Sequence, residues 1–269
     1  MMLSGITKRH RKEVKRYLIH YAEYILYKPT KGKSLEYFKY LQENYSQAYF
    51  IKQMYQILKF LKFLGIAWSE EIKLPKQPNY NPPRIDLEDI RNLLKQFEGE
   101  RNYPQIQAFI LITCTSGIRA MEGYKLQMSN ISLENRTIKL RAGQTKTRTA
   151  RVTFFNEGAQ NALRQYLHEF ETNQRSNTLF AETTIRRTFR NSQLKPKHLR
   201  KFFSQIWTRR NGNEAVKHLL MGHSQRSNVD QMHYNYQSEE DLKQIYDRVM
   251  GDLAIIHGEN KPQTITKTV

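Results

Sequence analysis

The chain has 269 residues, enough for one large or two small domains with a buried core. It carries 44 Lys and Arg against 25 Asp and Glu, a formal net charge of +19, which favours a polyanionic partner. With 39% hydrophobic and 12% aromatic residues it is too apolar for a disordered basic tail. The single cysteine, Cys114, excludes an intramolecular disulfide framework and a multi-cysteine zinc module.

The N-terminal stretch is basic and lacks the apolar run of a signal peptide. No segment approaches the roughly 18 uncharged residues that a membrane span needs. We therefore expect a cytoplasmic protein that acts on nucleic acid and has no membrane partner.

Residues 1–73 are predicted to form a small helical domain that opens with a basic helix. Apolar residues there recur at the i, i+3, i+4, i+7 spacing of a helix. They are Val14, Tyr17, Leu18, Tyr21 and Ile25 in one stripe and Phe50, Met54, Ile57, Leu58 and Leu61 in another. Residues 74–83 contain four prolines and are predicted to be an extended linker.

Residues 84–269 are predicted to form a second, mostly α-helical domain with a small antiparallel sheet. Helices are expected over 86–97 and 103–115, with Gly117 ending the second. Residues 137–141 and 148–154 alternate as strands do, around a turn at Gly143.

Helical patterns resume at residue 159 and continue towards the C-terminus. The last apolar stripe is compatible with packing inside its own domain or on a neighbouring copy of the chain. It consists of Leu242, Ile245, Tyr246, Val249 and Leu253.

Basic residues are concentrated in two stretches. Residues 135–156 and 183–213 contain no acidic residue, whereas 238–252 is mainly acidic. This distribution predicts a basic working surface on the second domain and a C-terminal helix that faces protein. Each basic stretch taken alone is also typical of a solvated face or a phosphate-positioning patch.

Four short segments carry candidate chemistry. Arg119 and Glu122 lie three residues apart on one helical face, as a capping pair or as an oriented phosphate-binding arginine would. Lys197 and Arg200 share a face near a helix N-terminus, which favours a phosphate. The other two segments present single side chains, Lys146 near a hairpin tip and His223 from a turn after Gly222.

In this order the segments resemble the boxes of the tyrosine recombinase, or phage-type integrase, family. The matching strings are T-S-G-I-R-A-M-E, T-K-T-R, K-H-L-R and L-M-G-H-S, followed by a tyrosine. The resemblance spans residues 84–250, and residues 1–73 match the core-binding domain of the family in position and size. It is closest in character to archaeal, viral, plasmid-encoded and Xer-like members.

The resemblance implies site-specific DNA recombination without a metal or any other cofactor. A tyrosine would attack the scissile phosphate, giving a 3′-phosphotyrosyl link and a free 5′-hydroxyl, and strand exchange and religation would follow. Arg119 and Arg200 would stabilise the charged transition state, and Lys146 would protonate the departing 5′-oxygen. His223 would donate a further hydrogen bond to the phosphate, and Glu122 would orient Arg119.

Two positions depart from the family pattern. The second arginine box most often has histidine three residues before its arginine, and here that residue is Lys197. We assign it the phosphate-binding role, with the neighbouring His198 as the alternative. The nucleophile usually follows the late histidine by nine residues, a position that is Met232 here. We expect Tyr234 to be the nucleophile because it projects off the apolar stripe that includes Tyr236, the alternative.

The resemblance also implies partners. Two domains would clamp double-stranded DNA at a specific site, and four copies would assemble on two duplexes. A mobile-element integrase in a prokaryotic cell, a virus or a plasmid is favoured over a housekeeping resolvase. The alternatives are a type IB topoisomerase-like nicking and closing enzyme and a non-catalytic DNA-binding relative.

Overall fold

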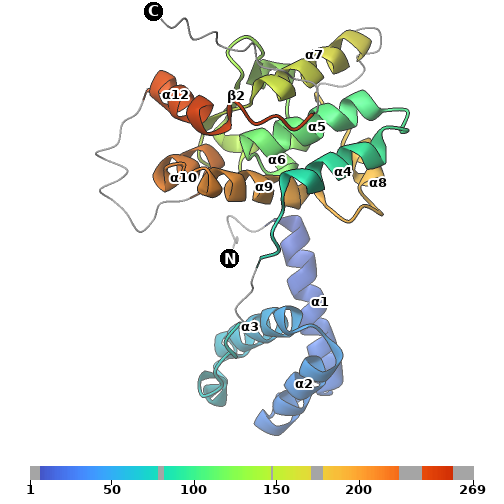
Figure 1. Cartoon of the computed structure of the whole chain (residues 1–269). Helices are drawn as coiled ribbons and strands as arrows, with labels where there is room; N and C mark the ends of the chain where they lie inside the picture. The colour runs from blue at the N-terminus through green and yellow to red at the C-terminus, as the bar shows by residue number, and fades with distance from the viewer. Residues whose placement is uncertain (1–6, 78–81, 147, 171–177, 224–237, 257–269) are drawn as a thin grey trace, which may run out of the picture. The chain divides into compact units, whose positions relative to one another are not determined.

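The computed structural model describes residues 7–77, 82–146, 148–170, 178–223 and 238–256 (Figure 1). The chain divides into two compact units, Met1–Pro82 and Pro83–Val269. Each unit has its own cluster of buried hydrophobic side chains. The boundary between them falls within the proline-rich segment, and their core-binding and catalytic roles remain predictions.

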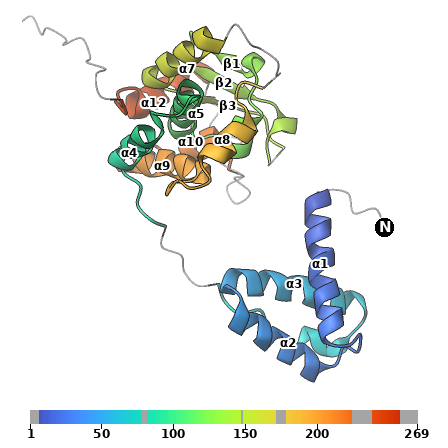
Figure 2. The same ribbon diagram turned by 90° about the vertical axis from the view of Figure 1, so that its right-hand side faces the viewer.

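The first unit is helical, and its elements begin at identifiable caps. They are α1 (Lys8–Tyr24), α2 (Lys31–Asn44), α3 (Gln47–Phe63) and the 3-10 helix η1 (Ala67–Glu70) (Figure 2). The hydroxyls of Thr7 and Thr30 each accept a hydrogen bond from the backbone N–H three residues on, which fixes the starts of α1 and α2. Tyr17 and Tyr21 of α1 are buried, as is the whole predicted stripe of α3.

The second unit contains most of the helices. They are α4 (Leu87–Phe97), α5 (Tyr103–Ser116), α6 (Ala120–Tyr124), α7 (Glu157–Phe170), α8 (Glu182–Thr188), α9 (Pro196–Arg209), α10 (Glu214–Met221) and α12 (Glu239–Met250). The helix α5 is central, with α4, α7 and α9 packed around it (Figure 2). Almost every α5 residue from Gln105 onwards is buried, so the helix is enclosed on all sides.

Gly117 ends α5 and places the next segment against α9. Its φ is +66°, in the left-handed region, and a Cβ there would lie 2.5 Å from the ring of Phe203. Both the conformation and the close approach therefore require glycine. The turn brings Arg119, two residues further on, next to α9.

A three-stranded antiparallel sheet completes the second unit. Its strands are β1 (Ile131–Ser132), β2 (Thr137–Leu140) and β3 (Arg151–Phe154), in the order β1-β2-β3. The strands β2 and β3 pair with Leu140 opposite Arg151. They are shorter than predicted. The chain turns at Gly143 as predicted, within the 3-10 helix η3 (Ala142–Gln144). The mostly helical fold with a small antiparallel sheet is the predicted class.

The helix α12 packs into the core of its own unit. Leu242, Tyr246 and Val249 are buried, and the Tyr246 hydroxyl donates a 2.9 Å hydrogen bond to the carbonyl of Thr115 at the end of α5. Of the two environments that the sequence allowed for this stripe, the structure shows the intramolecular one.

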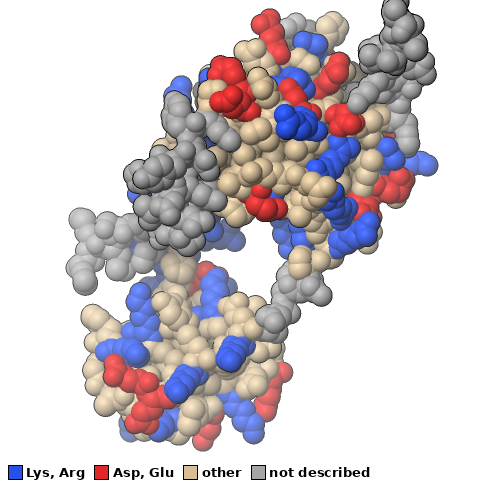
Figure 3. Space-filling view, turned by 60° about the vertical axis from the view of Figure 1, so that its left-hand side comes forward, with Lys and Arg blue, Asp and Glu red and all other residues tan. Residues whose placement is uncertain are grey.

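Acidic residues of α12 pair with part of the first basic stretch. Asp247 accepts from Arg136 at 3.0 Å, and Glu239 lies 2.8 Å from Lys139. Figure 3 accordingly shows Lys and Arg side chains interspersed with Asp and Glu on the described surface. Among the described helices, none is long and apolar enough to cross a lipid bilayer.

Candidate active site

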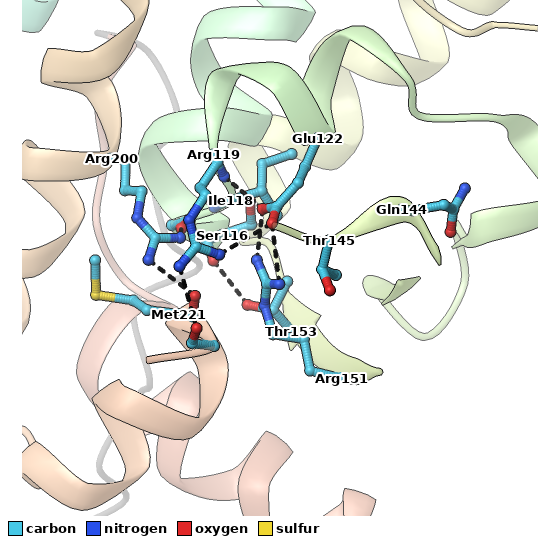
Figure 4. A network of polar contacts seen from close by, with 12 residues as sticks. Ser116, Ile118, Arg119, Glu122, Gln144, Thr145, Arg151, Thr153, Arg200 and Met221 are labelled. Atoms are coloured by element: carbon cyan, nitrogen blue, oxygen red, sulfur yellow. Dashed lines mark hydrogen bonds and ion pairs between the residues drawn. The ribbon is translucent and has the colours of Figure 1, made fainter. Parts of the chain in front are cut away.

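Arg119 begins α6 and is fixed there by Glu122. The Glu122 carboxylate accepts a 2.7 Å hydrogen bond from the Arg119 backbone N–H and a 3.0 Å bond from its Nη1. The same pair therefore caps the helix and orients the guanidinium (Figure 4). The capping pair that the sequence allowed is present, and phosphate binding by Arg119 stays a prediction. The Arg119 side chain keeps 23% of its surface exposed, whereas that of Glu122 keeps 2%.

Arg200 comes from α9 and faces the same region. Its Nη1 donates to the carbonyl of Gly117 at 2.6 Å and its Nη2 to that of Met221 at 2.8 Å. Burial, together with the nearby Arg119 and Arg151 guanidinium groups, lowers the pKa of Arg200 below its ordinary value. The position thus has an excess of positive charge that an anion would relieve.

His223 follows the C-terminus of α10. Gly222 ends that helix with a φ of +65°, and Arg119 Nη2 donates to its carbonyl at 3.1 Å. Partial burial and the positive charge of Arg200 lower the pKa of His223 to about 4. The imidazole is therefore neutral at pH 7, with one ring N–H to donate.

Arg151 completes this cluster, and the sequence reasoning missed it. Its side chain, at the start of β3, is 5% exposed and meets Glu122 at 2.6 Å and 3.2 Å through its two terminal nitrogens. Its Nε donates to the carbonyl of Leu220 at 3.0 Å. The only sequence signal was its place in a basic stretch without acids, which does not distinguish it from solvated neighbours.

The arginines share the C-terminal end of α10. The carbonyls of residues 220, 221 and 222 accept from Arg151, Arg200 and Arg119 respectively. A helix C-terminus leaves such carbonyls without intrahelical partners and carries a partial negative charge, so guanidinium groups are favourable there. Figure 4 shows Arg119 and Arg200 side by side above this end, and Arg151 reaching Glu122 from below.

The charge balance of the cluster is positive. Three guanidinium groups surround one buried carboxylate, whose pKa is lowered because the ion pairs with Arg151 and Arg119 outweigh its burial. Arg119 keeps 23% of its side-chain surface exposed against 5% for Arg151, and Arg200 is half-buried beside Arg119. Paired guanidinium groups of this kind bind the non-bridging oxygens of a phosphate and stabilise charge that develops on them.

The two predicted lysines are exposed and lie outside these contacts. Lys197 is on α9 one turn before Arg200 and, within the described part of the chain, makes no hydrogen bond or ion pair. Lys146 lies in the connection between β2 and β3, directly after Thr145. The Thr145 hydroxyl accepts from the Thr149 N–H at 3.1 Å and so holds the connection closed.

Of the alternative site residues, the structure describes His198 but neither of the two tyrosines. His198 Nδ1 accepts a 3.1 Å hydrogen bond from the Lys195 N–H, which caps α9. Its ring lines a cavity of about 360 Å³ with residues of α4 and of the segment 83–85, and none of the arginines of the cluster lines that cavity. Tyr234 and Tyr236 lie outside the described residues. Among the described residues, no group of three or more His, Cys, Asp or Glu could hold a metal ion.

The mostly helical fold with a small three-stranded antiparallel sheet matches that of the tyrosine recombinases. The model of the phage integrase family matches residues 83–247, and the chain belongs to that family. It is accordingly an enzyme of site-specific DNA recombination, which breaks and rejoins DNA strands.

Individual relatives are distant. The tyrosine recombinase XerC of Histophilus somni (strain 2336) is 24% identical over 213 residues, covering 72% of this chain and 70% of the relative. The Tn1549 transposon integrase, solved in complex with circular intermediate DNA, has a TM-score of 0.62 at 14% identity and covers 90% of this chain and 94% of that one. The XerH recombinase, solved with its difH substrate before cleavage, has a TM-score of 0.52 at 15% identity and covers 79% and 65%. At these low sequence identities, the two solved structures show that the chain shares their fold.

Proposed function

We propose that this recombinase cleaves one DNA strand at a time with Tyr234 as the nucleophile. The tyrosine oxygen bonds to the scissile phosphorus as the bond to the 5′-oxygen breaks. The products are a 3′-phosphotyrosyl link and a free 5′-hydroxyl. Attack by a 5′-hydroxyl of the other duplex reverses the step and rejoins the strands, with the bond energy conserved and no metal required.

The observation that carries this proposal is the cluster of Arg119 and Arg200 at the end of α10. In the pentacovalent transition state the non-bridging oxygens gain negative charge, and the two guanidinium groups, which protein carbonyls hold side by side, would stabilise it. The neutral imidazole of His223 adds a hydrogen-bond donor beside them. Glu122 supports the arrangement through its contacts with Arg119.

The lysines complete the proposed chemistry. Lys146 is the general acid that protonates the departing 5′-oxygen, since it sits exposed on the β2–β3 connection, from which a flexible side chain reaches bound DNA. Lys197 binds the phosphate backbone from the first turn of α9, where the helix dipole also favours an anion.

The proposed partner is double-stranded DNA carrying a specific recombination site. The net charge of +19 and the DNA complexes of the Tn1549 and XerH recombinases support it. We propose further that unit 1–82 is a core-binding domain that clamps the duplex together with the catalytic unit, and that four copies assemble on two duplexes. The Tn1549 transposon integrase among the structural relatives favours a mobile-element role in a prokaryotic cytoplasm.

A covalent trap tests the nucleophile. A nicked duplex, selected for binding from a random pool, releases a short fragment after cleavage and so prevents religation. Incubated in EDTA with the full-length chain, it should give a protein–DNA adduct on a denaturing gel. The adduct should disappear in Tyr234→Phe and persist in Tyr236→Phe.

The other outcomes separate the parts of the proposal. Loss of the adduct only in Tyr236→Phe would keep the chemistry and move the nucleophile to the alternative tyrosine. An adduct that persists in both single variants would exclude both tyrosines as the sole nucleophile. If the selected duplex is bound but no variant forms an adduct, the chain is a DNA-binding relative without cleavage activity.

A further inference from the structure

We propose that Arg151 is a positioning residue for DNA cleavage, joining the first arginine box to the turn that presents His223. It acts through Glu122 and through the end of α10, and it does not touch the DNA itself. The inference rests on the proposed function, because it concerns the placement of the groups that meet the phosphate.

The first link is the bidentate ion pair with Glu122. Both carboxylate oxygens are engaged by Arg151, at 2.6 Å and 3.2 Å, and the same oxygens hold Arg119. Both members of the pair are almost fully buried, so the planar fork fixes the plane of the carboxylate. The direction of Arg119 therefore depends on a residue of β3 that is 29 positions after Glu122 in the sequence.

The second link is the contact of Arg151 with the turn that carries His223. Arg151 Nε donates to the carbonyl of Leu220, and the Arg151 side chain packs closely against Gly222. A Cβ on Gly222 would come within 2.8 Å of Arg151 Cδ. The turn that carries His223 thus rests on the Arg151 side chain.

Arg151 is too enclosed to meet a phosphate. Each of its three guanidinium nitrogens already donates to a protein oxygen, and only 5% of its side-chain surface is exposed. Arg119, in contrast, keeps 23% of its side-chain surface exposed beside the same carboxylate. The two arginines on Glu122 therefore have different tasks, one meeting the DNA and one holding the support.

The charged groups facing Glu122 make the proposal testable through pH. Arg119 and Arg151 pair with it directly, and Arg200 is the next guanidinium of the cluster. Without Arg151, the burial of Glu122 is opposed mainly by Arg119 alone, so the pKa of this carboxyl rises. Its protonation at lower pH would then release Arg119.

The experiment compares Arg151→Gln with wild type in single-turnover adduct formation, across pH and with DNA affinity measured in parallel. Arg187→Gln, which removes an exposed arginine of α8, is the matched control for loss of one charge. We expect Arg151→Gln to bind DNA within about threefold of the control but to form adduct about 10- to 100-fold more slowly at pH 7, as a misplaced catalytic group does. Its rate should rise with pH, whereas that of the control should follow wild type.

The double variant Glu122→Gln/Arg151→Gln protects the test against a folding defect, because it replaces the buried ion pair by two neutral amides. This double variant should form adduct slowly, and its rate should not rise with pH. A wild-type rate in a folded Arg151→Gln or in the double variant overturns the inference, and so does a loss of DNA affinity as large as the loss of rate.

A readout without DNA separates this inference from the proposed function. By NMR, the pKa of His223 in the free protein should move from about 4 towards its ordinary value of 6.5 in Arg151→Gln, because a loosened turn exposes the imidazole. If wild type forms no adduct, the proposed function fails, and this shift alone decides the role of Arg151. An unchanged His223 pKa in a folded Arg151→Gln would then reject it.

Discussion

At the scale of single residues, one buried carboxylate holds the site together. Glu122 is 2% exposed and is the acidic partner of both Arg119 and Arg151. A buried charge is tolerated only while its partners remain, since water cannot replace them. The stability of the cluster therefore depends on the pair as a unit.

Glu122→Ala should destabilise the second unit strongly. It leaves the enclosed Arg151 guanidinium without its counter-charge, at a cost of about 3–5 kcal/mol in the free energy of unfolding. Glu122→Ala/Arg151→Met should recover most of this loss. Urea denaturation of both variants measures it, and a single variant as stable as wild type would show that water replaces the carboxylate.

The ion pairs of Glu122 also make the stability of the folded state depend on pH. Because the folded-state pKa of Glu122 lies below its ordinary 4.5, its contribution to stability is complete above pH 4.5 and is lost as the pH falls towards the folded-state value. The difference in unfolding free energy between wild type and Glu122→Gln should shrink over that window.

Gly222→Ala should damage both folding and cleavage. The φ of +65° costs a non-glycine residue about 1–2 kcal/mol, and the new Cβ would press on Arg151, which its ion pairs hold in place. Gly143→Ala is the matched control, because a Cβ there meets nothing within 4 Å. We expect a lower melting temperature and slower adduct formation only in Gly222→Ala, and equal behaviour of the two variants would contradict the assigned role of the turn.

At the scale of elements, helix ends build the site. The C-terminus of α5 supplies the Gly117 carbonyl to Arg200, and that of α10 supplies three carbonyls to three arginines. The helix α12 supports the first of these ends, since Tyr246 donates to the Thr115 carbonyl.

Tyr246→Phe tests this support. The substitution leaves the ring in the core and removes one buried hydrogen bond, which should cost about 1 kcal/mol of unfolding free energy. Tyr103→Phe makes the same change at a half-buried tyrosine. Among the described residues its hydroxyl accepts a hydrogen bond only from the Gln107 side chain, at 3.3 Å, so the change should cost less than about 0.5 kcal/mol. Equal effects would show that the contact with α5 contributes nothing.

Local sequence patterns predicted those features that depend on neighbours in the chain. Apolar periodicity located α3 and α5, and the Gly117 turn and the pairing of Arg119 with Glu122 follow from spacings of a few residues. Arg151 could not be found this way, because its partners are 29 and 69 residues distant and a basic strand residue is usually solvated. The irregular connection between β2 and β3 escaped prediction for a related reason. It is stabilised by side-chain contacts such as that of Thr145 with Thr149, and such contacts leave no periodic pattern of apolar residues in the sequence.

At the scale of the whole molecule, the two units carry similar net charges. Residues 1–82 contain 15 Lys and Arg against 6 Asp and Glu, a net +9, and residues 83–269 contain 29 against 19, a net +10. Acidic residues of the second unit form ion pairs with basic residues of the same unit, as Asp247 does with Arg136. Both units therefore retain the charge to contact phosphates.

A fragment of residues 83–269 should fold alone, because its core is formed by its own residues. We expect a cooperative thermal transition by circular dichroism. We also expect the full chain to show a steeper loss of DNA affinity with salt, by about 0.9 in logarithmic slope for every phosphate that residues 1–82 contact. Equal slopes for chain and fragment would contradict a DNA-clamping first unit.

The central claim is that Arg119 and Arg200 stabilise the transition state of strand cleavage. The measurement that tests it most directly is the single-turnover rate of adduct formation in EDTA for Arg119→Gln and Arg200→Gln, against Arg187→Gln as the control for lost charge. We predict that each of the first two variants is slower than wild type by about 100-fold or more while still binding the duplex, and that the control stays close to wild type. A folded Arg200→Gln that forms adduct as fast as Arg187→Gln would contradict the account.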